Sequence, residues 1–286
     1  MSRIPTAKSA RRFHASKHPM TEELRSKESK LYALLRSAGR IVIAFSGGVD
    51  STYLLWAAHE VLGSNAVAVT ISSAVIPENE LSDARSLCSS IGVRQIVIGA
   101  DVFSIDRFSE NPPDRCYWCK KALFGKILDE AHKNGIDTVA DGSNADDDND
   151  YRPGTKAAKE LGIISPLKNC GLTKSDIREL SKEAGLPTWN NPSMACLASR
   201  FPYGDQITPE GLKMVESAES VLKLKGLSQY RVRKIGGLAR IEVLPDEFPL
   251  ITENMKEISS EFMKMGFEDV ILDPKGYRTG SMNELL

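Results

Sequence analysis

The sequence contains no apolar run that approaches the roughly 20 residues that a membrane-spanning helix needs. It also has almost no charge imbalance, because 37 lysines and arginines stand against 38 aspartates and glutamates, for a formal net charge of -1. Proteins that coat nucleic acid carry a strongly basic surface. For this chain of 286 residues we therefore expect no membrane partner, and a nucleic-acid partner is disfavoured.

Acidic residues are missing from the first twenty positions, and so is the apolar core of a secretory signal. The segment instead carries five cations: Arg3, Lys8, Arg11, Arg12 and Lys17. We expect residues 1–20 to form a basic, disordered tail and the chain to stay in the cytoplasm. An organelle-targeting segment is the alternative interpretation.

Cysteine is scarce and its number is odd: Cys88, Cys116, Cys119, Cys170 and Cys196. An odd number in a chain without a secretory signal argues against a disulfide framework. The composition favours thiol or metal chemistry instead.

Short apolar runs that favour strands alternate with helical patterns through the first two thirds of the chain. The expected strands are 41–45, 66–71, 94–98 and 137–140, and the expected helices are 52–62, 79–91, 118–132 and 173–184. This alternation predicts an α/β fold with a doubly wound, mostly parallel sheet over residues 21–204. In such sheets ligands bind beyond the carboxyl ends of the strands.

A smaller α+β domain is expected over residues 205–286. Thr208-Pro209 is typical of a helix start, and Gly236-Gly237 between two strand-like segments, 230–235 and 238–244, predicts a hairpin. A helix over 249–265 and a short strand near Val270 follow. A unit this small buries little apolar surface. It therefore needs its neighbour or an oligomer partner.

The sharpest motif is the loop Ser46-Gly47-Gly48-Val49-Asp50-Ser51, which follows a buried strand and precedes a helix. Its glycines allow close approach of the backbone to phosphate oxygens, and the amides at the start of the helix favour an anion. The loop lacks the Lys-Ser/Thr ending of a Walker A motif. It resembles the PP-loop, SGGxDS, of the N-type ATP pyrophosphatases. That resemblance implies ATP cleavage between the α and β phosphates, with Mg²⁺ and a catalytic role for Asp50.

Two further strand ends resemble nucleotide-binding positions of PP-loop folds. Thr70 and Ser72, at the end of the second strand, are candidates for contact with adenine by that resemblance. The segment Asp141-Gly142-Ser143-Asn144-Ala145-Asp146-Asp147 resembles the loop that closes over nucleotide and metal, with Gly142 and Asn144 as candidate ligands. The alternative interpretation of the acidic residues in this segment is a solvent-exposed turn that binds no ligand.

A CxxC motif, Cys116-Tyr117-Trp118-Cys119, is expected at the start of a helix, where amides and nearby cations would stabilise thiolates. A third thiol, Cys196, lies far along the chain. A redox pair, a structural zinc site and a [4Fe–4S] cluster with one open iron remain alternatives on the residues alone. Cys88 and Cys170 are interpreted as core residues or helix neighbours.

Several long blocks, in order, resemble the LarE family: AFSGGVDSTYLL, NPPDRCYWCKKALF, DGSNADD, PLKNCGLTKSDIREL, ACLASRFPYG and RVRKIGGLARIEV. LarE-like enzymes adenylate a carboxylate of pyridinium-3,5-biscarboxylic acid mononucleotide and convert it to a thiocarboxylate during synthesis of the nickel-pincer nucleotide. In one type, the cysteine matching Cys196 gives up its own sulfur. A second type with three cysteines binds a [4Fe–4S] cluster that carries an extra sulfide. The resemblance therefore implies Cys116, Cys119 and Cys196 as cluster ligands, with Cys196 also catalytic.

The implied substrate is an anionic mononucleotide, so cations should line its pocket. The candidates are Ser199, Arg200, Arg231, Arg233 and Glu242, with Lys120 as a further catalytic cation. Alternation along a strand places Arg231 and Arg233 on one face, within reach of a single phosphate. A solvated strand face is the alternative.

Three other functions compete with sulfur insertion: tRNA 2-thiolation, amide formation by a PP-loop ligase, and nucleotide sensing without catalysis. The chain has no second CxxC for a zinc ribbon and no basic excess, and amide formation has no use for three thiols. The family further implies a homo-oligomer, and the sequence leaves the sulfur donor unknown.

Overall fold

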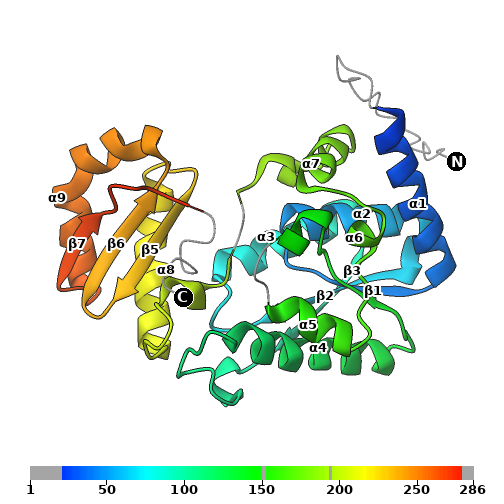
Figure 1. The fold of residues 1–286 in the computed structure, drawn as a ribbon, viewed down its shortest axis with the longest axis horizontal. Coiled ribbons are helices and arrows are strands. Elements are labelled where there is room, and N and C mark those ends of the chain that lie inside the picture. The colour runs from blue at the N-terminus through cyan, green and yellow to red at the C-terminus, as the bar shows by residue number, and fades with distance from the viewer. Residues whose placement is uncertain (1–20, 150–152, 193–194, 279–286) are drawn as a thin grey trace, which may run out of the picture.

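Four parallel strands in the order β3-β2-β1-β4 form the central sheet of the larger unit in the computed structural model of the chain (Figure 1). The structure describes residues 21–149, 153–192 and 195–278. The strands are β1 (Ile41–Ala44), β2 (Ala66–Ser72), β3 (Arg94–Gly99) and β4 (Val139–Ala140). Parallel registers join Ile41 to Ala66 and Val67 to Arg94. The predicted α/β class with a parallel sheet is confirmed.

Helices cover both faces of this sheet. One face packs against α1 (Glu22–Ala38), α2 (Val49–Leu62), α3 (Glu78–Ile91), α6 (Pro166–Asn169) and α7 (Lys174–Glu183), and the other against α4 (Arg115–Lys133) and α5 (Pro153–Glu160). Successive side chains of a strand point to opposite faces. Ile41 and Ile43 accordingly belong to the first core, whereas Val42 belongs to the second.

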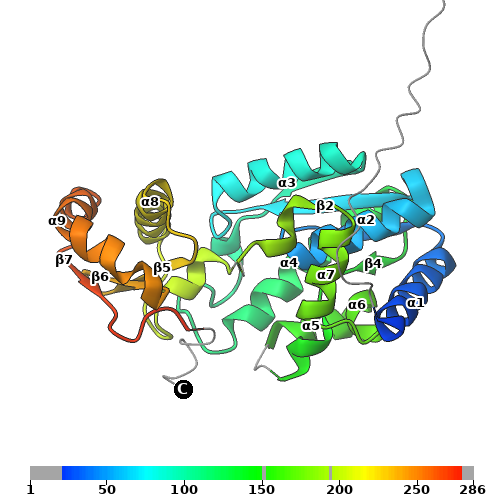
Figure 2. The same ribbon diagram turned by 90° about the horizontal axis from the view of Figure 1, so that it is seen from above.

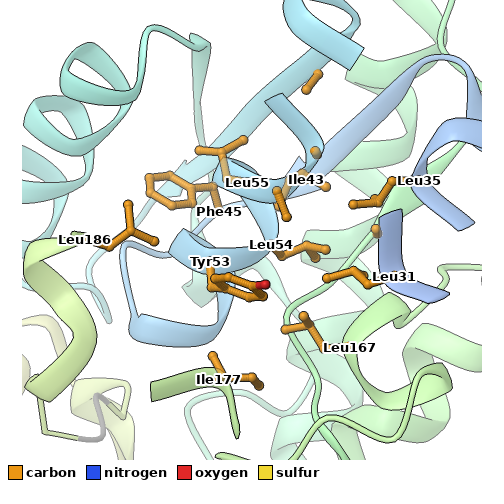
Figure 3. Packing of buried hydrophobic residues seen from close by; sticks show 14 of the residues in the cluster. Leu31, Leu35, Ile43, Phe45, Tyr53, Leu54, Leu55, Leu167, Ile177 and Leu186 are labelled. Carbon is orange, nitrogen blue, oxygen red and sulfur yellow. The ribbon is translucent and has the colours of Figure 1, made fainter. Parts of the chain in front are cut away.

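Figure 3 shows the first of these cores, in which α2 is enclosed on several sides. Leu31 and Leu35 of α1 lie near Leu54 of α2, and all three are fully buried. Ile177 of α7 approaches from the other side of Tyr53. Because α2 directly follows the predicted phosphate-binding loop, this packing holds the loop against the sheet.

The smaller unit contains a three-stranded sheet in the order β5-β6-β7, with β5 (Tyr230–Ile235), β6 (Leu238–Val243) and β7 (Asp269–Leu272). β5 and β6 form the predicted hairpin, and Gly236 at its turn has a φ of 56°. The helices α8 (Pro209–Leu224) and α9 (Phe248–Lys264) lie on one side of the sheet (Figure 2) and share its apolar core. The opposite face of β5 and β6 carries charged side chains, among them Arg231, Arg233 and Glu242.

The two units share packing at the segment between them. Leu197, Ala198 and Phe201 contact Val75 and Phe108 of the larger unit and the start of α8 in one buried cluster. The expected boundary near residue 204 falls in the loop between this segment and α8. The domain division stays a prediction, since a continuous core crosses it.

The expected elements are found, with shifted ends. α2 starts at Val49 and α4 at Arg115, each three residues before its expected start. α1, α5 and the short α6 have no counterpart among the expected elements. The remaining short turns are 3-10 helices: Gly63–Asn65, Val102–Ser104, Ala145–Asn149, Pro187–Asn190, Leu197–Arg200 and Pro245–Glu247. The predicted tail, residues 1–20, lies outside the described residues. None of the helices in the described ranges is long and apolar enough to cross a bilayer.

Candidate active site

A cavity of about 470 Å³ lies at the carboxyl ends of β1 and β2. Several parts of the chain line it: the glycine-rich loop after β1, the end of β2, the start of α3, the start of α4, the turn after β4, and the segment that carries Cys196. Apolar side chains close the space between them, among them Val75, Phe108 and Leu123. The predicted nucleotide loop and the three predicted cysteine ligands therefore meet in one cavity.

The glycine-rich loop is held by its own hydroxyl groups. Ser46 Oγ and Ser51 Oγ lie 3.1 Å apart, and Ser51 Oγ donates to the carbonyl oxygen of Gly48 at 3.1 Å. Gly47 has a φ of 81°, a region that side chains with a Cβ disfavour. α2 begins at Val49, so its first amides belong to the loop itself. A helix start of this kind favours a bound anion such as a phosphate.

Asp50 is held by two partners from distant segments. Lys174 Nζ, from the first turn of α7, contacts Asp50 Oδ2, and Asn144 Nδ2 donates to Asp50 Oδ1 at 3.4 Å. The amide of Lys174 donates to Asp146 Oδ2 at 2.7 Å. Sequence reasoning missed Lys174. The available signal was that Lys174 directly follows Thr173, which caps the helix. A capped helix start holds the backbone of the next residue in a defined position, so its side chain can be placed reliably at a site.

The turn after β4 lies directly against the loop. A Cβ added at Gly142 would be 3.0 Å from the amide nitrogen of Ser51 and 3.2 Å from its Cα. The buried Asp141 lines the cavity and accepts hydrogen bonds from Ser143 Oγ and Ser165 Oγ, both at 2.7 Å. Asn144 does not line the cavity, but it donates a hydrogen bond to Asp50, which does.

The two candidates for contact with adenine differ. Thr70 is buried, lines the cavity and accepts a hydrogen bond from Gln95 Nε2 at 2.8 Å, so its hydroxyl orientation is fixed. Ser72 ends β2 outside the cavity lining. Gln95 was not among the residues predicted from the sequence.

The five cysteines lie in two places. Cys116, Cys119 and Cys196 line the cavity, whereas Cys88 and Cys170 are buried in the core around α2. Burial raises the pKa of Cys119 to about 12, and the neighbouring cysteines act in the same direction. The expectation that cations stabilise a thiolate there is therefore wrong for Cys119, because burial outweighs Arg115 and Lys120. Within the described ranges, no three His, Cys, Asp or Glu side chains are close enough together to hold a metal.

Arg115 joins the two cysteine-bearing segments. Its buried guanidinium donates to the carbonyl oxygen of Ala198 at 3.0 Å and lies 3.7 Å from Cys116 Sγ. It also contacts Asn111 Oδ1, while Asn111 Nδ2 donates to the carbonyl oxygens of Phe201 and Pro202 at 3.3 and 2.6 Å. We call this pair, Arg115 and Asn111, the clamp. Nothing in the sequence pattern indicated it.

A second cavity, of about 330 Å³, lies between α3, α8 and β5, and we call it the arginine pocket because Arg200 and Arg231 line it. Arg200 is buried and forms a two-bond ion pair with Glu219, both contacts at 2.8 Å. Arg231 lies over the Tyr277 ring at 5.5 Å. Burial, with the nearby Arg200, lowers the pKa of Arg231. A bound anion would offset both effects.

The other predicted substrate residues lie beside the arginine pocket and not in its lining. Arg233 shares its strand face with Arg231 but pairs with the fully buried Glu242 at 2.9 Å, and it donates to the carbonyl oxygen of Ser199 at 2.5 Å. Arg240 also contacts Glu242, at 3.1 Å. The roles of Ser199, Arg233 and Glu242 in binding substrate stay predictions.

Lys120 lines the main cavity, 5.9 Å from the centre of the Phe124 ring. Its stem packs against Gly154 of α5, where an added Cβ would be 2.3 Å from Lys120 Cδ. A glycine at that position leaves room for the lysine side chain.

Comparison with known proteins agrees with this arrangement. The NAD synthase family model matches residues 28–113, which include the glycine-rich loop. An uncharacterised protein of Synechocystis sp. is 42% identical over 265 residues, 91% of this chain and 98% of the relative. An uncharacterised protein of Methanocaldococcus jannaschii is 34% identical over 84% of this chain and 91% of its own. The pyridinium-3,5-bisthiocarboxylic acid mononucleotide synthase of Lactiplantibacillus plantarum is 37% identical over 92% of this chain and 96% of its own. At this similarity over nearly the whole length, the chain belongs to the LarE family, that of the pyridinium-3,5-bisthiocarboxylic acid mononucleotide synthase.

Proposed function

We propose that the chain catalyses ATP-dependent sulfur insertion during nickel-pincer nucleotide biosynthesis. The substrate would be pyridinium-3,5-biscarboxylic acid mononucleotide, and the product a thiocarboxylate. One observation carries the proposal: the glycine-rich loop and three thiols line the same cavity of about 470 Å³. Activation of a carboxylate and its capture by sulfur need these two groups beside each other.

The first step would activate the substrate carboxylate. A carboxylate oxygen attacks the α-phosphorus of ATP, the bond from that phosphorus to the bridging oxygen breaks, and pyrophosphate leaves. The loop amides at the start of α2 and the hydroxyls of Ser46 and Ser51 would bind phosphate oxygens. Asp50 and Asp141 offer the hard oxygen ligands that Mg²⁺ prefers, and both line the cavity. When bound, Mg²⁺ neutralises charge on the leaving pyrophosphate.

The second step would exchange oxygen for sulfur. A sulfur nucleophile attacks the acyl carbon, the bond to the adenylate oxygen breaks, and AMP leaves with that oxygen. Cys196 is the exposed thiol of the three, so it is open to a substrate in the cavity. The buried guanidinium of Arg115 supplies positive charge beside Cys116.

For the sulfur source we propose a [4Fe–4S] cluster held by Cys116, Cys119 and Cys196. The support is the type and number of donors, since three thiols from two segments border one cavity and the other two cysteines lie in the core. The thiols of the described residues are not close enough together to hold a single metal ion, so the cluster would have to span the distance between the two segments. A cluster with three protein ligands leaves one iron able to carry an exchangeable sulfide. The chain's contribution is to hold the two segments together through the clamp.

The alternative is a sacrificial reaction of Cys196. Its Sγ would attack the acyl carbon and release AMP. Loss of the cysteine α-proton to a base, with breakage of the Cβ–Sγ bond, would then leave dehydroalanine and a thiocarboxylate. This route needs neither Cys116 nor Cys119. The presence of both in the same cavity supports the cluster.

The substrate phosphate would bind in the arginine pocket. Arg231 is held there beside Arg200 with a lowered pKa, a condition that an anion relieves. Arg231→Ala should weaken binding of the mononucleotide about tenfold or more and leave ATP binding unchanged. An equal loss of both affinities would contradict this assignment.

Release of pyrophosphate tests the overall reaction. With ATP, Mg²⁺ and the mononucleotide, purified protein should release pyrophosphate and, given a sulfur source, also AMP and a product whose mass reflects sulfur in place of oxygen. Unmodified tRNA serves as the competing substrate. Pyrophosphate release with tRNA and none with the mononucleotide would overturn the proposal.

Iron and acid-labile sulfide content distinguish the two sulfur sources. Anaerobically purified protein should contain about four irons per chain, and Cys116→Ala should lose them. Cys170→Ala is the matched control, because that thiol lies in the core. A protein without iron, in which Cys196 loses its sulfur during turnover, would favour the sacrificial route.

We also propose that the chain forms a homo-oligomer through its smaller unit. Leu224 and Met263 are 88% and 52% exposed at the ends of α8 and α9. Apolar side chains that lie together in an exposed patch are typical of interfaces, and the proposal takes these two as part of such a patch. Leu224→Glu should lower the mass found by light scattering. A monomeric parent protein would contradict the proposal.

A further inference from the structure

The main cavity and the arginine pocket share a wall. Two residues, Glu80 of α3 and Ala195, line both cavities. Ala195 is the residue before Cys196 and its carbonyl oxygen accepts a hydrogen bond from Arg200 Nη1 at 2.6 Å. Cys196 and the arginine pocket are therefore neighbours, and Glu80 is the charged residue that lines both cavities.

The charges around Glu80 are mixed. Arg200 and Arg231 attract its carboxylate, whereas Glu219 and Asp83 repel it. Burial is the largest effect, and together these raise the pKa of Glu80 to about 7. A half-buried carboxyl of this kind is a strong hydrogen-bond acceptor when ionised and a donor when protonated. It suits a hydroxylated ligand in either state.

A second polar group in the arginine pocket points to a ligand there. Gln229 is 8% exposed and lines the pocket, and its side-chain Nε2 has no hydrogen-bond partner among the described residues. A buried donor without an acceptor costs free energy. A bound oxygen-rich group, such as a phosphate, would satisfy it.

We infer that Glu80 binds the ribose hydroxyls of the mononucleotide substrate. The inference rests on the proposed function, which assigns the phosphate to the arginine pocket and the reacting carboxylate to the main cavity. In a mononucleotide the ribose lies between phosphate and ring, and Glu80 is the polar residue that borders both cavities. Vicinal hydroxyls donate well to a carboxylate. Glu80 thereby selects a ribonucleotide over its deoxy counterpart.

Two probes test this role: nicotinic acid mononucleotide, a pyridinium monocarboxylate, and its 2′-deoxyribose counterpart. We expect calorimetry on the full chain to give about tenfold weaker binding of the deoxy probe. Glu80→Ala should bind both probes equally, and Glu80→Gln should keep part of the preference because its amide oxygen still accepts. Asn79→Ala is the matched control, since Asn79 is on α3 but lines the arginine pocket alone.

The outcomes separate this inference from the proposed function. If the parent protein binds both probes through Arg231 and Glu80→Ala keeps the full preference, the role of Glu80 is overturned while the substrate assignment stands. If the parent binds neither probe, both are overturned. Far-ultraviolet circular dichroism of each variant shows that the fold is intact.

Discussion

Arg115 Nη1 donates to the carbonyl oxygen of Ala198 at 3.0 Å, so a residue beside the CxxC motif holds the segment that carries Cys196. The contact is buried and spans 83 positions of sequence. Asn111 adds two hydrogen bonds to the same segment, at Phe201 and Pro202. The separation of the thiols around the cavity therefore depends on these two side chains, of which Arg115 also lines the cavity.

We predict that Arg115→Ala lowers the yield of cross-linking between Cys196 and the CxxC motif by a short bifunctional thiol reagent. Loss of hydrogen bonds from a buried charged group also destabilises the fold by about 2–3 kcal/mol. The yield is measured by mass spectrometry on protein without iron, well below its unfolding temperature. Lys121→Ala, on the exposed side of α4, is the control. An unchanged yield in Arg115→Ala would show that the clamp does not position the thiols.

We predict that Gly142→Ala weakens ATP binding about tenfold or more. The new Cβ would be 3.0 Å from the backbone nitrogen of Ser51, so the start of α2 must shift by a few tenths of an ångström, and with it the phosphate-binding amides. Equilibrium binding of a fluorescent ATP analogue measures the effect. Gly125→Ala in α4 is the control, because an added Cβ there meets no atom within 4 Å. Equal affinities for both variants would contradict the close-approach argument.

We predict that Lys174→Met slows pyrophosphate release about a hundredfold with little loss of stability. Lys174 contacts Asp50 and brings a cation to the edge of the loop, where charge develops on the leaving pyrophosphate. Lys182→Met is the control. Lys182 is in the last turn of the same helix, where its ammonium lies over the Trp189 ring, and its loss should keep the fold. If both variants keep the parent rate, Lys174 only holds Asp50 in place.

The sequence predicted the elements whose local pattern is strong and missed those that depend on distant partners. The strand–loop–helix from Ile41 was recognisable, because glycine and serine positions mark a phosphate loop. α1 was missed since only Leu24, Leu31 and Leu35 of its seventeen residues are buried apolar positions, too few for a visible stripe.

The charged residues of the smaller unit illustrate the same limit. Alternation along β5 placed Arg231 and Arg233 on one face, and the structure agrees. The alternation alone does not reveal that Glu242 on the neighbouring strand pairs with Arg233. This pairing depends on the register of the two strands and on what covers their face. The clamp and the Asp50–Lys174 contact likewise join positions far apart in sequence, and only the tertiary fold brings them together.

We predict that Arg200→Ala destabilises the protein by about 3–5 kcal/mol, because it leaves Glu219 as a buried charge without its partner. Glu219 Oε1 also accepts a hydrogen bond from the amide of Val232 at 3.0 Å, which cannot replace the lost cation. The double variant Arg200→Met with Glu219→Gln should recover part of the loss. Urea unfolding measures all three. A single variant as stable as the parent would show that the pair is solvated in solution.

Glu80 predicts a dependence of stability on pH. Its pKa is raised from 4.5 to about 7, chiefly by burial, so the folded state binds this proton more tightly than the unfolded state does. The stabilisation is present below 4.5 and is lost as pH rises toward about 7, so between these values the parent protein should lose stability relative to Glu80→Gln. Thermal midpoints of both proteins, measured across that range at constant ionic strength, give the difference. Arg200 and Arg231 limit the rise by attracting the ionised form. A difference that does not change with pH would mean that Glu80 titrates at its ordinary value, with the arginines and solvent outweighing burial.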